Sequence, residues 1–444
     1  MSPRRVLIAL LFAAWPGLGR AQLDPFDQAL VQPDQIIESV DIRGNGRTQE
    51  GVIRRRILLA EGDLVDDRLV QASRLRLLGT GFFSEVDFSL ERGSRRGRVI
   101  LVVTVEERNT VVVDRLYLGT SPVSRLFGGL GVADGNFLGR GVTLGGTFAL
   151  GEDRQAVEAR TFLPSLADTA LQLSASFIFV RGAELLDASQ EDGFQLRYRR
   201  VGGTFGLGIG VGPAQRVSVI YRLESVNADR LPNLDPPVLR QAPSIQFDES
   251  VISTVRLGYE RDTRNDPFVP TSGDQLAFGI ELGTSLLGSD YEFSKYTGSG
   301  ALALEPFPAH SLVFRAEAGL IQGQAAFFDQ FFIGDHTYFA FGRDSLPRAV
   351  QLNFSEANDY DDLLLGGGVE YALPLYQGRS GIYRIYLYAG VEAVVTASLD
   401  EVQEDPSGRS TGGFFPMSFD LGLKMDTLLG AFTLSSAYIA ELFL

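Results

Sequence analysis

The sequence has no cysteine and only two histidines, His310 and His336. The missing thiols exclude a disulfide framework, a cysteine metal site and a cysteine nucleophile. Two histidines are too few for a histidine-rich metal centre. Ser311 follows His310, but Pro306 and Pro308 mark that segment as a turn, which disfavours a Ser-His-Asp hydrolase site. We therefore expect no enzyme activity, no bound metal and no cofactor.

Lysine is almost absent as well, since Lys295 and Lys424 are the only two and arginine supplies the other positive charges. The 40 basic and 55 acidic side chains leave a net charge of −15, which disfavours nucleic acid as a partner. Arginine forms bidentate pairs with carboxylates, so its prevalence suits a lattice of charges inside a polar lumen. A compositional bias of the genome would explain the same prevalence equally well.

The sequence also lacks a run of about 18 apolar residues, the length that a membrane-spanning helix needs. Its N-terminus has the composition of an export signal: Arg4 and Arg5 precede the short apolar stretch Val6–Trp15, and small residues surround a cleavage point after Ala21. We predict that residues 1–21 are a signal peptide. An exported chain without a spanning helix is periplasmic, secreted or a transmembrane barrel.

Alternation of apolar and polar residues dominates from Asn109 to Leu444. For example, Leu276, Phe278 and Ile280 point one way while the small or polar residues between them point the other. An apolar face opposite a face of Arg, Glu, Gly and Tyr is the pattern of a barrel with lipid outside and a wet lumen. A soluble sandwich also alternates, but seldom over so long a stretch.

We therefore predict a mainly β fold in which residues 109–444 form a transmembrane antiparallel β-barrel. The average length of a strand and its turn gives ~16 strands. A direct count of the alternating segments gives fifteen. Single-chain barrels usually close with an even number of strands, so either two strands have been merged or the chain ends one strand early.

Residues 34–108 show a different pattern, with the order β-α-α-β-β. Strands are expected at Ile36–Arg43, Phe82–Leu90 and Val99–Glu106. Thr48 is expected to cap a first helix, and Asp66–Leu78 has the apolar spacing of a second helix that ends at Gly79. The segment is long enough for one small core.

Three stretches of this segment carry a family resemblance: IRGN near its start, LLGTGFFSEV after the second helix and VTVEE in the last strand. With the element order, they resemble a POTRA domain, the periplasmic module that precedes barrels of the outer-membrane protein 85 superfamily, the BamA and TamA type. The resemblance implies that residues 34–108 bind an extended client or a partner along an exposed strand edge. A rigid spacer is the alternative. We find one such domain, where the BamA and TamA types carry several.

Four stretches of the barrel segment resemble the same superfamily. The most specific is YERDTRNDPFVPTSG, which matches a periplasmic turn motif of the family at Tyr259, Arg261, Asp262, Pro270 and Gly273. Its Asn-Asp-Pro and Ser-Gly pairs are turn formers, so we interpret the motif as a folding feature. The other three stretches are Gly131–Gly141, Gly366–Leu375 and Ser418–Ala437.

The segment Phe331–Arg348 interrupts the alternation and lies in a run of seven aromatic residues from Phe327 to Phe341. A long insert between strands is either a surface loop or a segment folded back into the space that the strands enclose. Surface loops seldom carry so many aromatic side chains, so we favour the second interpretation.

This segment resembles the sixth extracellular loop of the superfamily, which folds into the lumen and carries an Arg-Gly pair at its tip. Here Phe341 and Gly342 stand in that place, and the nearest arginine is Arg343. The resemblance implies that Arg343 pairs with Glu370 and Asp420 and locks the loop. The alternative is that these three are ordinary lumen charges.

Together these features predict a non-enzymatic protein of the bacterial outer membrane, with its POTRA domain in the periplasm. The resemblance implies assembly and insertion, or translocation, of other proteins. The expected partners are outer-membrane lipid, unfolded or extended client proteins and periplasmic accessory proteins, and no nucleic acid. A two-partner-secretion translocator and a passive, porin-like barrel are the alternatives.

Overall fold

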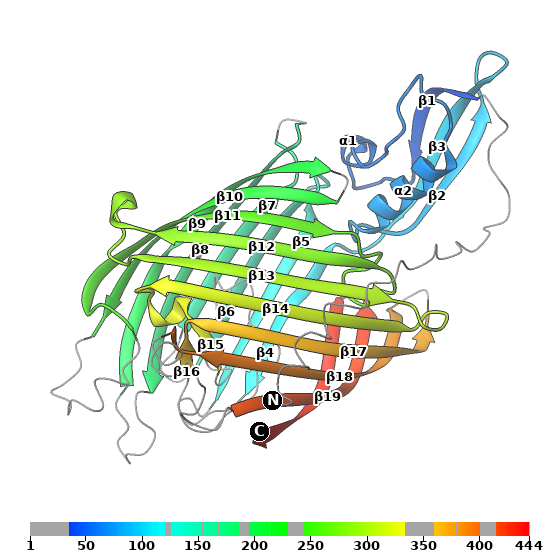
Figure 1. Ribbon diagram of the computed structural model, residues 1–444. Helices are drawn as coiled ribbons and strands as arrows, with labels where there is room; N and C mark the ends of the chain where they lie inside the picture. Colours follow the sequence, from blue (N-terminus) through cyan, green and yellow to red (C-terminus); the bar gives the residue numbers. More distant parts are fainter. Residues whose placement is uncertain are drawn as a thin grey trace, which may run out of the picture.

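β-strands make up most of the structure, a computed structural model that describes residues 35–119, 126–151, 155–166, 169–185, 195–212, 214–229, 244–333, 359–378, 381–399 and 414–443 (Figure 1). The strands form one sheet of three, one of fifteen and one of two. The predicted order, a small β-α-α-β-β unit followed by a large antiparallel sheet, is confirmed. No helix in these residues has both the length and the apolar character needed to cross a membrane.

The small unit, which we call the N-terminal module, consists of β1 (Ile36–Arg43), α1 (Glu50–Arg54), α2 (Asp67–Leu78), β2 (Phe83–Arg92) and β3 (Arg98–Glu107). Its sheet has the order β1-β3-β2, with β1 parallel and β2 antiparallel to β3. Both helices contribute to a single apolar core with the sheet, which includes Ile53, Leu77, Val86 and Leu101. The module therefore has its own core.

The ends of α2 follow local sequence signals, whereas the start of α1 is determined by tertiary contacts. The Asp66 side chain accepts a hydrogen bond from the Arg68 N–H, and α2 ends at Gly79, as the sequence predicts. The first helix differs from the prediction because its N-cap is Gln49 and has no side-chain cap. Thr48 is instead buried and hydrogen-bonds to residues distant in sequence, which removes it from the cap.

The large sheet contains fifteen strands, and every sequential pair of neighbours is antiparallel. They are β4 (Val111–Gly119), β5 (Phe127–Phe137), β6 (Val142–Leu150), β7 (Gln155–Leu163), β8 (Leu171–Leu185), β9 (Gln195–Gly212), β10 (Gln215–Ala228), β11 (Asp248–Asp262), β12 (Gly273–Gly283), β13 (Phe293–Leu304), β14 (Ser311–Gly323), β17 (Leu363–Gln377), β18 (Ile382–Ala397), β19 (Phe414–Thr427) and β20 (Gly430–Phe443). The direct count agrees with the sheet, whereas the average strand length gave one strand more.

Figure 1 shows this sheet curled into a barrel, with the N-terminal module beyond one end. We call that end the module end and the other the far end. Connections at the module end are short, such as residues 138–141 and 428–429, and the longest connection, residues 324–362, is at the far end. The predicted outward faces are exposed: on β12, Phe278 is 55% and Leu282 is 43% exposed.

Short elements interrupt two connections at the far end. A 3-10 helix, η2 (Ser285–Leu287), joins β12 to β13. After β14 come a second 3-10 helix, η3 (Phe327–Asp329), and the strand β15 (Phe331–Ile333), which pairs with β16 (Asp359–Asp361). Thus η3 and β15 lie at the start of the connection between β14 and β17, and β16 lies at its end. This is the connection that contains the predicted inward-folding segment.

Candidate functional site

The connection after β14 starts inside the barrel. We call its described first part, residues 325–333, the loop root. Phe327 and Phe328 are fully buried, and Phe331 is 4% exposed. They belong to one apolar cluster with side chains from strands around much of the wall, among them Tyr198, Val226, Ile252, Ile321, Leu364 and Val394. The root therefore fills part of the lumen near the far end.

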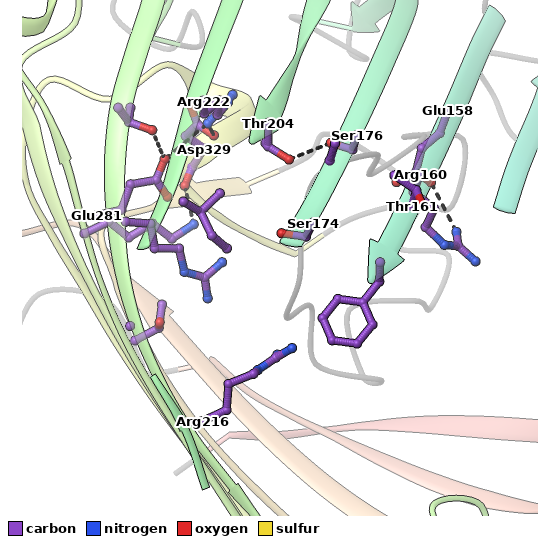
Figure 2. Close-up of a pocket in the computed structure, with 18 of the residues that line it drawn as sticks. Glu158, Arg160, Thr161, Ser174, Ser176, Thr204, Arg216, Arg222, Glu281 and Asp329 are labelled. Carbon is purple, nitrogen blue, oxygen red and sulfur yellow. Dashed lines mark hydrogen bonds and ion pairs between the residues drawn. The ribbon is translucent and has the colours of Figure 1, made fainter. Parts of the chain in front are cut away.

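A network of charges attaches the root to the wall. The Asp329 carboxylate lies 2.8 Å from Arg222 Nη1 on β10, and the Lys295 ammonium on β13 donates to the Asp329 backbone oxygen at 2.8 Å. Figure 2 shows Asp329 of η3 close to Arg222 of β10 and Glu281 of β12. Arg222 also lies 3.5 Å from Glu281 on β12. Four elements thus share one ionic cluster, which holds the root in a defined place.

The charge network extends from Arg222 to Glu224 and Arg200, next to the Phe328 ring. Glu224 accepts from Arg222 at 2.6 Å and from Arg200 at 2.8 Å, and the side chains of Arg200 and Glu224 are both 3% exposed. The Arg200 guanidinium lies 4.0 Å from the centre of the Phe328 ring. A buried arginine that pairs with a carboxylate and stacks on an aromatic ring is restrained in both position and orientation. The expected lattice of arginine–carboxylate pairs is present in the lumen.

A cavity of about 490 Å³ with many charged lining residues adjoins the root (Figure 2). Its charged lining comes from the barrel wall and the root: Glu158, Arg160, Arg216, Arg222, Arg256, Glu281, Lys295 and Asp329. Threonine and serine hydroxyls such as those of Thr204 and Ser176, which hydrogen-bond each other, fill the spaces between the charges. The lining thus combines charged and hydroxyl groups with apolar side chains such as Phe162 and Ile220.

Gly319 on β14 makes room for the root. A Cβ atom at this position would lie 2.1 Å from Cζ of Phe331. We expect the substitution Gly319→Leu to displace the Phe331 ring, at a cost of about 1–3 kcal/mol of stability, because an overpacked site must rearrange. Planar-bilayer recordings should show a larger conductance than that of the wild type.

Gly367→Leu provides the matched control, since the nearest atom outside its own neighbours, the Arg315 oxygen, is 3.4 Å from the position that a Cβ would take. It should leave the conductance unchanged. Equal conductance for Gly319→Leu and the wild type would mean that Phe331 does not obstruct the lumen.

The predicted family turn lies at the module end, between β11 and β12, and it folds inward. Val269 is buried in one cluster with Ala372 of β17 and with Tyr386 and Tyr388 of β18, and Phe268 packs against this cluster. The Ser311 hydroxyl at the start of β14 donates to the Pro270 oxygen. Residues 263–272, which we call the inward turn, therefore contact strands that are not their neighbours in the sheet.

Turn chemistry shapes this segment as the sequence indicates. The Asn265 side chain accepts from the N–H groups of Thr271 and Ser272, and the Asp266 side chain accepts from that of Phe268. Gly273 has a φ of 95°, which favours glycine.

The other motif residues lie around the turn. Arg261 pairs with Asp274 at 3.1 Å, and Asp262 pairs with Arg264 at 2.7 Å. Tyr259 stacks on Phe278 across the β11–β12 pair, on the outer face. These contacts are local to the β11–β12 hairpin, and only Pro270 contacts a more distant strand.

Glu370 and Asp420, the two acids of the predicted loop lock, face the same side of the sheet. They pair in register with the same residue, Gly390 of β18, from its two sides. Glu370 is 3% exposed and is bound by the buried ammonium of Lys424 and, at 3.3 Å, by Arg315. Asp420 accepts from the Ser418 hydroxyl at 3.1 Å. Phe341, Gly342 and Arg343 lie outside the described residues.

A chain of ion pairs runs from the inward turn to the N-terminal module. Arg384 on β18 lies 2.7 Å from Asp266 and 2.8 Å from Asp426 on β19. Asp426 in turn lies 3.2 Å from Arg108, which follows β3 of the module. The chain connects the inward turn, two barrel strands and the segment between module and barrel.

The first and last strands, β4 and β20, form the edges of the large sheet. Along the described lengths of these strands, no ladder joins them. Contacts occur at the module end, where the Val113 N–H donates to the Leu429 oxygen and the Asn109 side chain donates to the Leu428 oxygen, both at 2.8 Å. The barrel is therefore nearly closed, with a seam that is joined at one end.

Several of these residues were not assigned to a site from the sequence: Arg200, Arg222, Glu224, Lys295, Asp329 and Lys424. The rarity of lysine was a usable signal, because both lysines turn out to hold carboxylate or carbonyl groups inside the barrel. His310 and Ser311 face different partners, Tyr371 and Pro270. In the described part of the chain no cluster of three His, Cys, Asp or Glu side chains could hold a metal ion.

Comparison with known proteins agrees with both parts of the structure. Residues 136–389 match the model of the Omp85 superfamily domain, and residues 35–108 match the POTRA model, described as a surface antigen variable number repeat. The outer membrane protein assembly factor BamA of Nitratidesulfovibrio vulgaris is 24% identical over 309 residues, which are 67% of this chain and 36% of that protein. BamA of Neorickettsia risticii is 38% identical over 103 residues, which are 23% of this chain and 14% of the relative. The chain thus spans about a third or less of these relatives.

Two solved structures share the fold. BamA from Haemophilus ducreyi lacking POTRA domains 1–3 has a TM-score of 0.50 at 16% identity, covering 92% of this chain and 82% of that chain. CdiB from Escherichia coli has a TM-score of 0.61 at 12% identity, covering 92% and 75%. At such identities the likeness concerns the arrangement of module and barrel alone.

Proposed function

Because this chain belongs to the Omp85 superfamily, we propose that it assembles other proteins into the bacterial outer membrane or moves them across it. Its barrel spans the outer membrane and its POTRA module lies in the periplasm, so the module end is the periplasmic end. The action is non-enzymatic: strand edges and a polar lumen guide an extended client chain.

The seam between β4 and β20 carries this proposal. Unpaired backbone N–H and C=O groups at a strand edge are a template for another extended chain. In lipid such groups cost several kcal/mol each unless they are paired, which favours the entry of a client strand. For the seam to open along its whole length, the few contacts at its periplasmic end would have to break.

The filled lumen favours this function over that of a passive pore. The loop root occupies the lumen near the far end, and its Asp329 is bound by Arg222 of β10 and Lys295 of β13. A porin-like barrel would keep an open aqueous channel instead. We therefore expect a small conductance for the wild-type protein in planar bilayers.

A reversible lock across the seam tests the proposal. Val112 Cβ lies 3.3 Å from the position that a Cβ of Gly430 would take, close to the spacing in a disulfide. Since the chain has no cysteine, V112C/G430C contains the introduced thiols alone. In proteoliposomes, the oxidised variant should fold an unfolded barrel client no faster than empty liposomes do, and reduction should restore the rate.

The reduced variant is its own matched control for any strain at Gly430. Equal client folding by the oxidised and reduced forms would refute a function that depends on seam opening.

Depletion of the protein in its host separates assembly from translocation. Loss of a set of outer-membrane barrels, measured by proteomics of the membrane fraction, would support assembly. Loss of a secreted protein with unchanged barrels would support translocation, as in a two-partner-secretion system. No change in either fraction would contradict both.

A further inference from the structure

The helical face of the POTRA module concentrates positive charge on an acidic protein. Six arginines fall between residues 54 and 76, although the whole chain has a net charge of −15: Arg54, Arg55, Arg56, Arg68, Arg74 and Arg76. Nearby acids are used locally. Glu50 pairs with Arg54 at 2.7 Å, and the Asp66 side chain caps α2. Glu50 and Asp66 are therefore engaged in shaping α1 and α2.

Arg56 and Arg76 stand out within this group. Both are partly buried, and the structure records no ion pair or hydrogen bond for either guanidinium within the described residues. Burial lowers the pKa of Arg56, and the charges of Arg76 and Arg55 lower it further. Burial also lowers the pKa of Arg76. Arginine nevertheless keeps its charge in proteins, so the charge of Arg56 lies within electrostatic reach of those of Arg76 and Arg55.

The packing of the two helices fixes this arrangement. The Ser73 hydroxyl of α2 accepts from the Leu58 N–H at 2.9 Å and donates to the Leu69 oxygen at 2.6 Å. Ile57 and Leu77, the neighbours of Arg56 and Arg76 in sequence, are both buried in the module core. The two arginines are thus held at the surface by the fold, and they cannot separate without disturbing that core.

The N-terminal end of α1 lies beside the barrel rim. The Gln49 N–H, immediately before α1, donates to the Gly139 oxygen in the β5–β6 turn at 2.9 Å. The Asn136 side chain donates to the Thr48 hydroxyl at 2.9 Å. Figure 1 shows α1 on the side of the module that faces the barrel. Leu138 in this turn is 68% exposed, as suits a side chain at the edge of a bilayer.

We propose that Arg56 and Arg76, with the charge of Arg55 beside them, bind the phosphate group of an anionic lipid in the periplasmic leaflet of the outer membrane. A guanidinium pairs with phosphate through two parallel hydrogen bonds. The phosphate neutralises the mutual repulsion of the arginines. Membrane lipid is favoured over an acidic protein because the barrel rim places the bilayer next to α1 at all times. The bound lipid would fix the orientation of the module beneath the seam.

Lipid retention by the full chain tests this site. Wild-type protein is placed in nanodiscs of phosphatidylcholine with a minor share of phosphatidylglycerol, and native mass spectrometry counts the lipids that stay bound. R56Q/R76Q should reduce the enrichment of phosphatidylglycerol by roughly fivefold for each arginine, since one basic side chain near an anionic surface contributes about that much binding.

The matched control removes the same charge from the other end of the module. Arg95 and Arg96 are exposed in the turn between β2 and β3, opposite the end at which β3 leads into the barrel. R95Q/R96Q should retain phosphatidylglycerol as the wild type does. Equal retention by the wild type and R56Q/R76Q would overturn the proposal, and so would an equal loss in both variants, which would indicate general charge attraction.

A charge-preserving variant controls for the possibility that R56Q/R76Q loses lipid because the module misfolds. R56K/R76K keeps both charges but loses the bidentate geometry, so its enrichment should fall between that of the wild type and R56Q/R76Q. If a glutamate-rich peptide binds the wild type and not R56Q/R76Q while lipid retention is the same in both, the surface takes an acidic protein and the lipid assignment fails. None of these readouts requires client assembly, so the site and the proposed function fail independently.

Discussion

Replacement of Lys424 by methionine is expected to lower the free energy of unfolding by about 3–5 kcal/mol, the usual cost of removing one partner of a buried ion pair. The side chains of Lys424 and Glu370 are 1% and 3% exposed. In the variant Glu370 would lose the buried ammonium but keep its 3.3 Å ion pair with Arg315, whose side chain is 35% exposed. Urea titration of the folded barrel in lipid vesicles, followed by gel mobility without heating, measures the change.

The double variant K424M/E370Q distinguishes two causes of the instability: loss of the Lys424–Glu370 attraction and burial of the Glu370 charge without Lys424. It removes both charges, so it should regain most of the stability that K424M loses. If the single and double variants were equally unstable, the loss would come from packing around Phe268 and Tyr388, the rings near the Lys424 ammonium, and not from an uncompensated carboxylate.

Replacement of Phe328 by alanine is expected to cost a similar amount, about 3–5 kcal/mol, because a fully buried aromatic side chain is removed from a packed cluster. The Phe328 ring is stacked 6.1 Å from that of Tyr198 and lies under the Arg200 guanidinium. Its loss also removes the surface on which the arginine rests. The same urea titration applies, and the conductance of the variant should rise as the root loosens.

Phe314→Ala on β14 is the control, since Phe314 is 42% exposed on the outer face of the barrel. Its truncation should cost clearly less and should leave the conductance unchanged. An equal loss for both variants would mean that Phe328 contributes ordinary apolar burial and does not anchor the loop root.

The alternating segments predicted the barrel well because a period of two is a local property. On β12, Phe278 and Ile280, which were assigned outward from the sequence, are exposed, and Leu276 on the same face is half-buried. The module order was equally visible, since turn and cap signals such as Asp66 and Gly79 act within a few residues. The count of fifteen strands followed from the same local alternation.

Contacts between distant strands could not be predicted in this way. The inward turn was recognised as turn chemistry, but its packing on Ala372 and Tyr386 depends on how the sheet curls. Thr48 had the signature of a helix cap, yet its hydrogen bonds go to Glu107 and Asn136. The pairing of Asp329 with Arg222 joins residues 107 positions apart. A single sequence gives no register for such pairs.

The direction of the edge strands gives the seam a further property. Fourteen antiparallel steps separate β4 from β20 in the sheet, so these two edges run the same way along the barrel. Direct closure would join them as a parallel pair, unlike every other pair in the wall. One additional strand running in the opposite direction would instead be antiparallel to both edges at once. A single inserted strand could therefore pair in antiparallel fashion with both β4 and β20. An inserted hairpin has two opposed strands, so one of them would have to pair in parallel fashion with its barrel edge.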